Sequence, residues 1–135
     1  MMAHIDIRKV LVVDADEHDR TALRGHLEHH GYIVECAENA VDAIRVGLVL
    51  EPRLVLSDLH LGEDSQAEQV FHALRRRLPD VHTALVCAAP DDETLARYRN
   101  IGIDAVFEKP LRREHLDEYL ARLFATPPKD QQENT

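Results

Sequence analysis

The sequence predicts a doubly wound α/β fold, in which a five-stranded parallel sheet carries helices on both faces. Five short apolar runs rich in β-branched residues alternate with segments whose apolar residues recur at helical spacing. With 135 residues, of which 44% are hydrophobic, the chain has the usual size of one domain with one core. Alternating strands and helices favour parallel pairing, and right-handed crossovers leave only a few strand orders.

The first predicted strand covers residues 8–14 and contains a continuous apolar run at 10–13 that leads straight into an acid. Its length and its β-branched residues are typical of a strand that is buried on both faces. From 17 to 30 the pattern becomes helical, with Leu23 and Leu27 on one stripe. Gly31 ends this helix, because glycine readily adopts the left-handed conformation found there.

The second strand is predicted at 32–37, and Asn39 can cap a helix that extends to about Leu50. Glu51 ends this helix, because the residue before a proline, here Pro52, disfavours the α conformation. We expect three apolar side chains of this helix to point inward: Val41, Ile44 and Leu48.

Three further strands are predicted, at 54–58, 82–89 and 104–109. The helix between the first two ends before Pro79 and carries an apolar stripe of period 3.6: Ala67, Val70, Phe71, Leu74 and Leu78. Asp91 or Asp92 can cap the next helix, which Gly102 closes. The last helix is marked by Leu116, Leu120 and Leu123.

These elements define one domain over residues 8–124, preceded by an N-terminal extension at 1–7. Residues 125–135 are polar, and we expect them to form a disordered tail. The tail is too short for an effector domain, so we expect a stand-alone domain that acts through another protein.

Composition and charge exclude several function classes. The net charge of −9 argues against a nucleic-acid surface and against docking on an anionic membrane. No apolar run approaches the roughly 20 residues of a membrane span, and the N-terminus lacks a secretory segment. Two cysteines are too few for a disulfide framework. A cytoplasmic location is therefore expected.

Chemically active side chains follow the predicted strands where each one ends. Asp14 lies at the end of the first strand, Asp58 at the end of the third and Lys109 at the end of the fifth, with Cys87 near the end of the fourth. In a doubly wound sheet the functional crevice lies at these carboxyl ends. Clustered acids favour a hard cation such as Mg²⁺, and a metal, a lysine and a nucleophilic carboxylate suit phosphoryl transfer.

At this point the sequence resembles the receiver domains of two-component response regulators. The resemblance covers about residues 8–124 and rests on "KVLVVDADEHDR", "LEHHGYIVECAENAVDAI", "LVLSDLHL" and "GIDAVFEKPL", in this order and spacing. It implies a flavodoxin-like fold with strand order 2-1-3-4-5. It also implies a phosphorelay protein that carries an aspartyl phosphate and is not an enzyme, with autophosphatase activity at most.

The resemblance assigns roles residue by residue. Asp58 matches the phosphoacceptor, which takes its phosphoryl group from a histidine kinase or a phosphotransfer protein. Lys109 matches the lysine that contacts the phosphate, and its bond to Pro110 matches a peptide that is usually cis. Asp14, Asp58 and the backbone carbonyl of His60 match the ligands of Mg²⁺. The backbone of Ala88 and, more weakly, the thiol of Cys87 match contacts to the phosphoryl group.

The sequence departs from the family pattern at four positions. Ala15 replaces the second acid of the metal-binding pair, so we expect weaker Mg²⁺ binding, by about 1–3 kcal/mol. Asp16 could substitute for that acid, but we favour it as the cap of the first helix. Cys87 and Val106 stand at the two switch positions, where the family has a hydroxyl and an aromatic residue, so we expect only a small conformational change. Gly62 replaces a common proline.

Two interpretations follow from these departures. In the favoured one, the domain still accepts phosphate, because Asp58 and Lys109 are both present. In the other, it is a degenerate receiver that acts as a protein docking module independent of phosphate. A remote third alternative is a haloacid-dehalogenase-type phosphatase, with Asp14 as nucleophile, Asp16 as general acid and the acids of 90–93 as the late motif.

Three further features of the sequence carry weaker signals. Cys36 and Cys87 lie on strands three places apart in the order 2-1-3-4-5, roughly 14 Å, which is too far for a disulfide. His26 and His30 have the i,i+4 spacing of metal-binding pairs, although a partly solvated helix face is the favoured interpretation. The family uses the face of the fourth helix, fifth strand and fifth helix for an output partner or for a homodimer.

Overall fold

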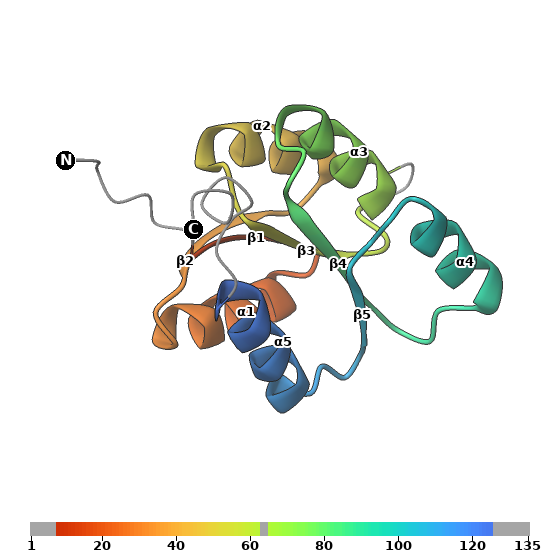
Figure 1. The fold of residues 1–135 in the computed structure, drawn as a ribbon. Helices are drawn as coiled ribbons and strands as arrows, with labels where there is room; N and C mark the ends of the chain where they lie inside the picture. The colour runs from red at the N-terminus through yellow and green to blue at the C-terminus, as the bar shows by residue number, and fades with distance from the viewer. Residues whose placement is uncertain (1–7, 63–64, 126–135) are drawn as a thin grey trace.

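The computed structural model describes residues 8–62 and 65–125, and these form one α/β domain (Figure 1). The five strands are β1 (Lys9–Val13), β2 (Ile33–Ala37), β3 (Leu54–Asp58), β4 (His82–Cys87) and β5 (Ala105–Glu108). The five helices are α1 (Glu17–His29), α2 (Ala40–Leu50), α3 (Ala67–Arg77), α4 (Asp92–Asn100) and α5 (Arg113–Ala125). Each predicted element is present, within a few residues of its expected ends.

The strands form one parallel sheet in the order β2-β1-β3-β4-β5, which confirms the predicted fold class. The pairing aligns the carboxyl ends of the strands: Val13 lies beside Ser57, and Asp58 lies beside Val86. Residues at or just after the carboxyl ends of β1, β3 and β5 therefore meet at one edge of the sheet.

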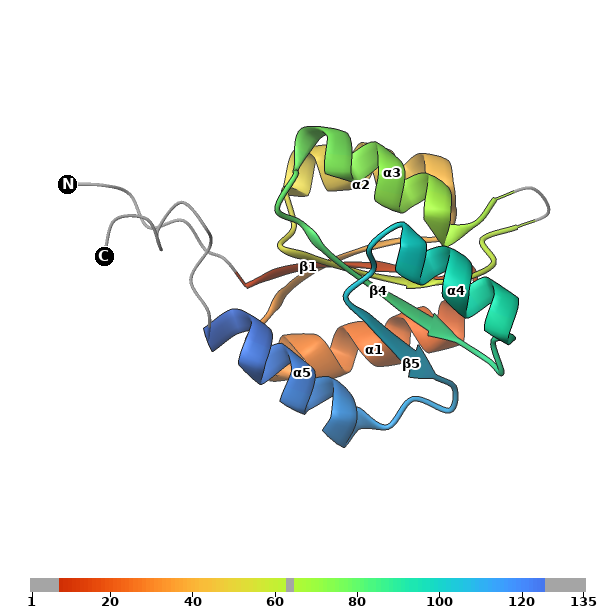
Figure 2. The same cartoon turned by 45° about the vertical axis from the view of Figure 1, so that its right-hand side comes forward.

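Helices cover both faces of the sheet (Figures 1 and 2). The helices α1 and α5 lie on one face, while α2, α3 and α4 lie on the other. Alternate strand residues supply two apolar layers, because successive side chains point to opposite faces. Leu11 and Val13 pack on the side of α2 and α3, whereas Val10 and Val12 pack on the side of α1 and α5.

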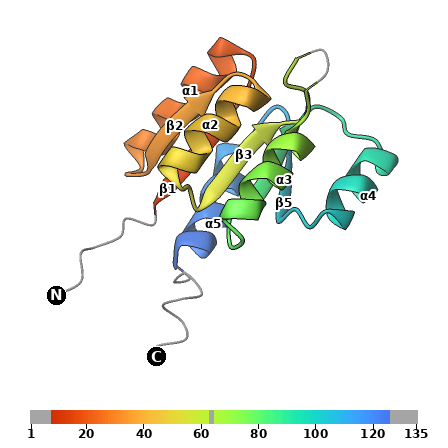
Figure 3. The ribbon, with the colours of Figure 1, turned by 90° about the horizontal axis from the view of Figure 1, so that it is seen from above.

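The packing of α2 differs from the prediction. Val41 is 74% exposed and Leu48 is 40% exposed, while Ile44 is only partly buried. The buried residues of α2 are small ones: Ala40, Ala43 and Gly47. Small residues allow the helix to lie close to its neighbours, and α2 runs alongside α3 in Figure 3. The predicted inward face of this helix was therefore wrong.

Helix ends follow the predicted local chemistry. The side chains of Asp16, Asn39 and Asp91 each accept a hydrogen bond from the backbone N–H three residues later, as N-caps do. Gly31 and Gly102 have φ values of 90° and 85° just after α1 and α4. The peptide bond between Lys109 and Pro110 is cis, as the resemblance implied.

The ends of the predicted domain lie partly outside the described residues. The last helix extends to Ala125, one residue beyond the expected boundary at 124. The predicted extension at 1–7 and the rest of the predicted tail, 126–135, fall outside the described residues. Within 8–62 and 65–125, no helix combines the length and the apolar character that crossing a membrane requires.

Candidate functional site

Lys109 brings three carboxylates together at the carboxyl edge of the sheet. Its Nζ lies 3.2 Å from Oδ2 of Asp58 and 3.4 Å from Oδ2 of Asp14. It also lies 3.3 Å from Oδ2 of Asp19, a residue in the first turn of α1. The backbone N–H of Lys109 donates to the carbonyl of Cys87 at 2.9 Å, which extends the β4–β5 pairing to this residue. The predicted meeting of residues 14, 58 and 109 is confirmed.

Asp14 is the most deeply buried acid of this cluster, with 6% of its surface exposed. Its Oδ1 accepts a hydrogen bond of 2.9 Å from the backbone N–H of Asp16. Burial raises the pKa of Asp14; the Asp16 N–H and Lys109 oppose this rise, while Asp58 and Asp19 add to it. Ionising this buried carboxylate is costly, and a cation placed beside it would offset that cost.

Asp58 combines a fixed orientation with access to solvent. Its Oδ1 accepts a hydrogen bond of 2.8 Å from the backbone N–H of Leu59, and its Oδ2 contacts Lys109. The side chain is 21% exposed, compared with 8% for Asp14. Of these two carboxylates, Asp58 is therefore the one that an incoming electrophile reaches more easily.

The ammonium of Lys109 remains charged over the physiological range. Burial alone would lower the pKa of Lys109, but the carboxylates of Asp58 and Asp14 together outweigh it and raise the pKa. One positive charge thus faces three carboxylates, those of Asp14, Asp19 and Asp58. The cluster retains an excess of negative charge, which suits a further cation.

Asp19 and Arg20 belong to this site, and the sequence analysis missed both. Asp19 contributes the third carboxylate, and the guanidinium of Arg20 donates to the carbonyl oxygen of Asp14 at 2.8 Å. The sequence did carry a signal, since α1, capped by Asp16, begins only a few residues after β1 ends at Val13. Predicting the contact with Lys109, 90 residues away, required the fold.

Asp16 serves as the N-cap of α1, as we favoured. Its Oδ1 accepts a hydrogen bond of 2.9 Å from the backbone N–H of Asp19, and this bond lowers the pKa of Asp16. Ala15, beside it, is exposed and carries no ligand atom in its side chain. Ala15 stands where the resemblance implies a second acid. The alternative role of Asp16 as a metal ligand stays a prediction.

The remaining predicted site residues lie around the same edge. Cys87 ends β4 and is 2% exposed, and burial, followed by the nearby charge of Asp58, raises the pKa of its thiol. Ala88 follows it and is exposed. His60 is exposed in the loop after β3, where its backbone pairs with Gln66. Val106 is half-buried against the core layer on the side of α3 and α4.

The donor set at this edge fits a magnesium ion. Asp14 and Asp58 supply carboxylate oxygens, which are the ligands that Mg²⁺ prefers, and the cluster carries excess negative charge. Binding one more hard cation would offset the cost of ionising Asp14, whose pKa is raised by burial. Asp14 and Asp58 are therefore the side chains that could hold the ion.

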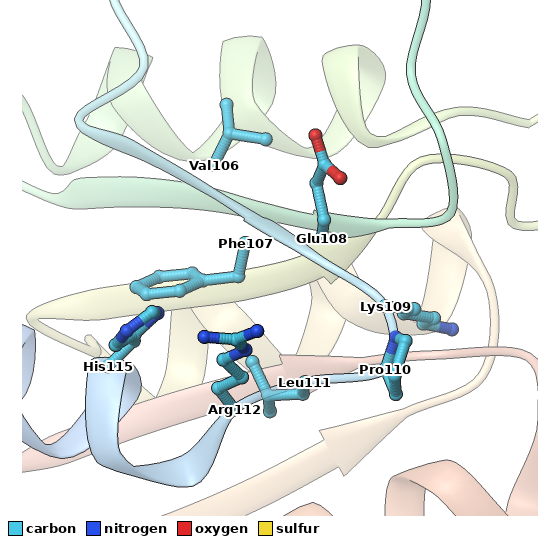
Figure 4. A pocket seen from close by; sticks show the side chains of 8 residues that line it. All are labelled: Val106, Phe107, Glu108, Lys109, Pro110, Leu111, Arg112 and His115. Carbon is cyan, nitrogen blue, oxygen red and sulfur yellow. The ribbon is translucent and has the colours of Figure 1, made fainter.

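A pocket of about 430 Å³ lies next to the acid cluster, along β5 and the start of α5 (Figure 4). It is lined by Val106, Phe107, Glu108, Lys109, Pro110, Leu111, Arg112 and His115. In Figure 4, Val106 and Glu108 point to one side of β5, while Phe107 points to the other side, toward His115. Lys109 is the residue that the pocket and the acid cluster share, because it lines the pocket and its Nζ contacts Asp58.

Nothing at the site supports the phosphatase alternative. Asp16, its general acid, is engaged as the cap of α1. Asp91, from its proposed late motif, caps α4 in the same way, with its Oδ1 accepting from the N–H of Thr94. Cys36 and Cys87 are both free thiols on strands three places apart, so the expectation of no disulfide is confirmed.

Comparisons with known proteins agree with this geometry. The family model described as the response regulator receiver domain matches residues 10–121, which is most of the chain. The chain is 26% identical over 121 residues to the transcriptional regulatory protein CrdR of Helicobacter pylori. It is 27% identical over 122 residues to the photosynthetic apparatus regulatory protein RegA of Cereibacter sphaeroides.

Each of these alignments covers 90% of this chain but only 57% of CrdR and 66% of RegA. The chain thus spans less than two thirds of the length of these curated relatives. Among solved structures, a CheY-like response regulator receiver domain protein from Methanospirillum hungatei has a TM-score of 0.79 with 25% identity. That match covers 96% of this chain and 98% of the other.

Proposed function

Because the chain belongs to the response regulator receiver domain family, we propose that Asp58 accepts a phosphoryl group from a phosphohistidine on a partner protein. The observation that carries this proposal is the 3.2 Å contact between Lys109 Nζ and Oδ2 of Asp58. It holds a cation beside an acid that is fixed in orientation and open to solvent. The partner would be a histidine kinase or a phosphotransfer protein. We also propose a cytoplasmic location for this reaction.

In the proposed reaction, one oxygen of Asp58 forms the new P–O bond as the P–N bond of the donor breaks. The donor imidazole leaves with the electron pair of that bond and takes up a proton. Lys109 pairs with the phosphoryl oxygens and neutralises part of their charge. We expect no catalysis beyond autophosphatase activity, which is hydrolysis of the acyl phosphate on Asp58.

Asp14, Asp58 and the backbone carbonyl of His60 would hold Mg²⁺, which when bound neutralises charge on the transferring phosphoryl group. Ala15 supplies no oxygen, so one charged ligand of the usual set is replaced by water. We propose that this weakens Mg²⁺ binding by about 1–3 kcal/mol.

The proposed output surface is the face formed by α4, β5 and α5. The pocket along β5 supports this assignment, because Lys109 lines it and also contacts the phosphoacceptor. A charge change at Asp58 can therefore bias the conformation of this pocket and its affinity for a partner protein or a second copy of the chain.

A docking module that does not depend on phosphate is the second candidate function. It is favoured by the two switch positions, where the Cys87 thiol is a weak donor and Val106 has no ring to move. Under this proposal a partner binds the α4–β5–α5 face equally well whether or not Asp58 is modified.

Incubation with acetyl phosphate and Mg²⁺, followed by intact-mass measurement, tests the phosphoacceptor proposal. We expect a phosphoryl adduct on the wild type, no adduct on Asp58→Asn, and less adduct on Lys109→Gln. The matched control is Asp92→Asn, which removes an exposed acid of α4 and should keep the full adduct. An equal adduct on Asp58→Asn, or none on the wild type at any Mg²⁺ concentration, would overturn the phosphoacceptor proposal.

A further inference from the structure

A second cluster of ligand atoms lies far from the acid site, between α1 and α5. His26 and His30 lie one turn apart at the end of α1, and Asp117 lies on α5. One ligand atom from each of the three residues lies within 4.8 Å of the other two. Nε2 of His26 is 2.7 Å from Oδ1 of Asp117, and the rings of His26 and His30 are 4.6 Å apart.

The packing of α1 against α5 holds the three ligand residues close together without a metal. The helices α1 and α5 share one apolar layer beneath the sheet, where Leu27, Leu116 and Leu120 are at most 1% exposed. Leu27 follows His26 directly, and Leu116 precedes Asp117. The buried side chains therefore fix the separation of the two helices, and the ligand atoms meet without a large rearrangement.

We propose that His26, His30 and Asp117 bind one divalent transition-metal ion of the zinc class. Two imidazoles and one carboxylate are a common ligand set for Zn²⁺, with water completing the site. Bond lengths of about 2.0–2.2 Å place ligand atoms roughly 3.3 Å apart in a tetrahedral site. The present spacing needs only small side-chain rotations to reach this value.

The cluster is partly open to solvent. The side chain of His26 is 10% exposed and that of Asp117 is 40% exposed, while His30 is exposed at the end of α1. An ion can enter from solvent and keep a water ligand on the open side. Mg²⁺ prefers oxygen ligands, so it should favour the acid cluster around Asp14 and not this site.

His30 distinguishes a metal site from a simple contact between helices. The hydrogen bond between His26 and Asp117 would link α1 to α5 without any third residue. A metal site needs the imidazole of His30 as well, and that ring contacts the rings of His26 and His29. Replacing His30 therefore removes a proposed ligand while leaving the His26–Asp117 bond in place.

Zn²⁺ titration of the full, untagged chain by calorimetry tests the proposal, with saturating Mg²⁺ present to fill the acid cluster. We expect one equivalent of Zn²⁺ to bind and to raise the unfolding temperature. Because losing even an outer partner of a metal ligand costs about 10–100-fold in affinity, His30→Gln should weaken binding at least tenfold. His29→Gln, which changes the neighbouring exposed histidine, is the matched control and should bind as the wild type does.

The same titration on Asp58→Asn separates this inference from the proposed function, since that variant should bind Zn²⁺ unchanged. The proposal is overturned if the wild type shows no saturable equivalent of Zn²⁺, or if His30→Gln binds as tightly as the wild type.

Discussion

The ammonium of Lys109 lies 3.2 Å from the carboxylate of Asp58, although 51 residues separate them in the chain. One follows β5 and the other ends β3, with β4 between the two strands. The contact exists because parallel strands deliver their carboxyl ends to one edge of the sheet.

Asp14→Asn should stabilise the protein at neutral pH. Burial raises the pKa of Asp14, so the folded state holds the acid proton more tightly than the unfolded state. The ionised carboxylate therefore opposes folding at pH 7, and a neutral amide removes that cost. Each unit of such a shift corresponds to about 1.4 kcal/mol. Urea unfolding at several pH values measures the effect.

The gain in stability from Asp14→Asn should shrink as the pH falls. It should disappear below about pH 4, where Asp14 is protonated in the unfolded state as well. Asp16→Asn is the control. Because the pKa of Asp16 is lowered, replacing it with a neutral amide should give no gain in stability at pH 7. An Asp14→Asn variant that is less stable than the wild type at pH 7 would contradict this account of the site.

Ala15→Asp should tighten Mg²⁺ binding. It restores the second acid of the pair next to Asp14, and about 1–3 kcal/mol corresponds to roughly 5–150-fold in the dissociation constant. Calorimetric titration with Mg²⁺ measures the change, and Ala22→Asp, on an exposed part of α1, is the control. If Ala15→Asp left the affinity unchanged, Asp16 would already be serving as a ligand.

Gly47→Ala should destabilise the fold by about 1–2 kcal/mol. A methyl group at Gly47 would lie 2.7 and 2.8 Å from the two terminal carbons of Leu74, which is completely buried in α3. The cost of overpacking, about 1–3 kcal/mol, exceeds the gain of up to about 1 kcal/mol in helix propensity. Thermal or denaturant unfolding measures the difference.

Gly25→Ala is the matched control, since a methyl group at this exposed position of α1 would meet nothing within 4 Å. It should stabilise the protein by about 0.5–1 kcal/mol through helix propensity alone. Equal effects of the two substitutions would show that α2 does not approach α3 as closely as the structure indicates.

Part of this fold could be predicted from the sequence, and part of it, such as the inward face of α2, could not. The strands, the caps at Asp16 and Asn39, and the meeting of acids with Lys109 were predictable, because each depends on local pattern or on strand polarity. The inward face of α2 could not be predicted, because large and small apolar residues occur all around this helix. Periodicity could not show that the close approach of α3 selects the small ones.

Contacts between distant surface residues were equally hard to predict. In the sequence, Asp19 and Arg20 are ordinary polar residues of a first helical turn. Only the fold shows that Asp19 contacts Lys109 and that Arg20 donates to the carbonyl of Asp14. The histidine pair of α1 gave only a weak signal, because its third partner, Asp117, lies 91 residues from His26. Both cases depend on which helices share a face of the sheet.

Phosphorylation of the wild type should produce only a small conformational change. Val106 has no aromatic ring that could move between buried and exposed positions, and the thiol of Cys87 is a weak donor to a phosphoryl oxygen. Amide NMR shifts on treatment with acetyl phosphate should change at the acid cluster and little along α4. The double variant Cys87→Thr, Val106→Tyr should extend the changes to α4 and β5.

Cys36→Thr is the control for the double variant, because Cys36 lies on β2, away from the phosphoacceptor, and its substitution should not extend the response. Large shift changes throughout α4 in the phosphorylated wild type would instead mean that another residue performs the switch.

Locating the phosphoryl group by tandem mass spectrometry tests the central claim most directly. The protein is treated with acetyl phosphate and Mg²⁺, digested, and fragmented to find which side chain carries the added mass. The account predicts one modified residue, Asp58, with Asp14 and Asp19 unmodified. An adduct on a different acid of the cluster, with Asp58 unmodified, would contradict it.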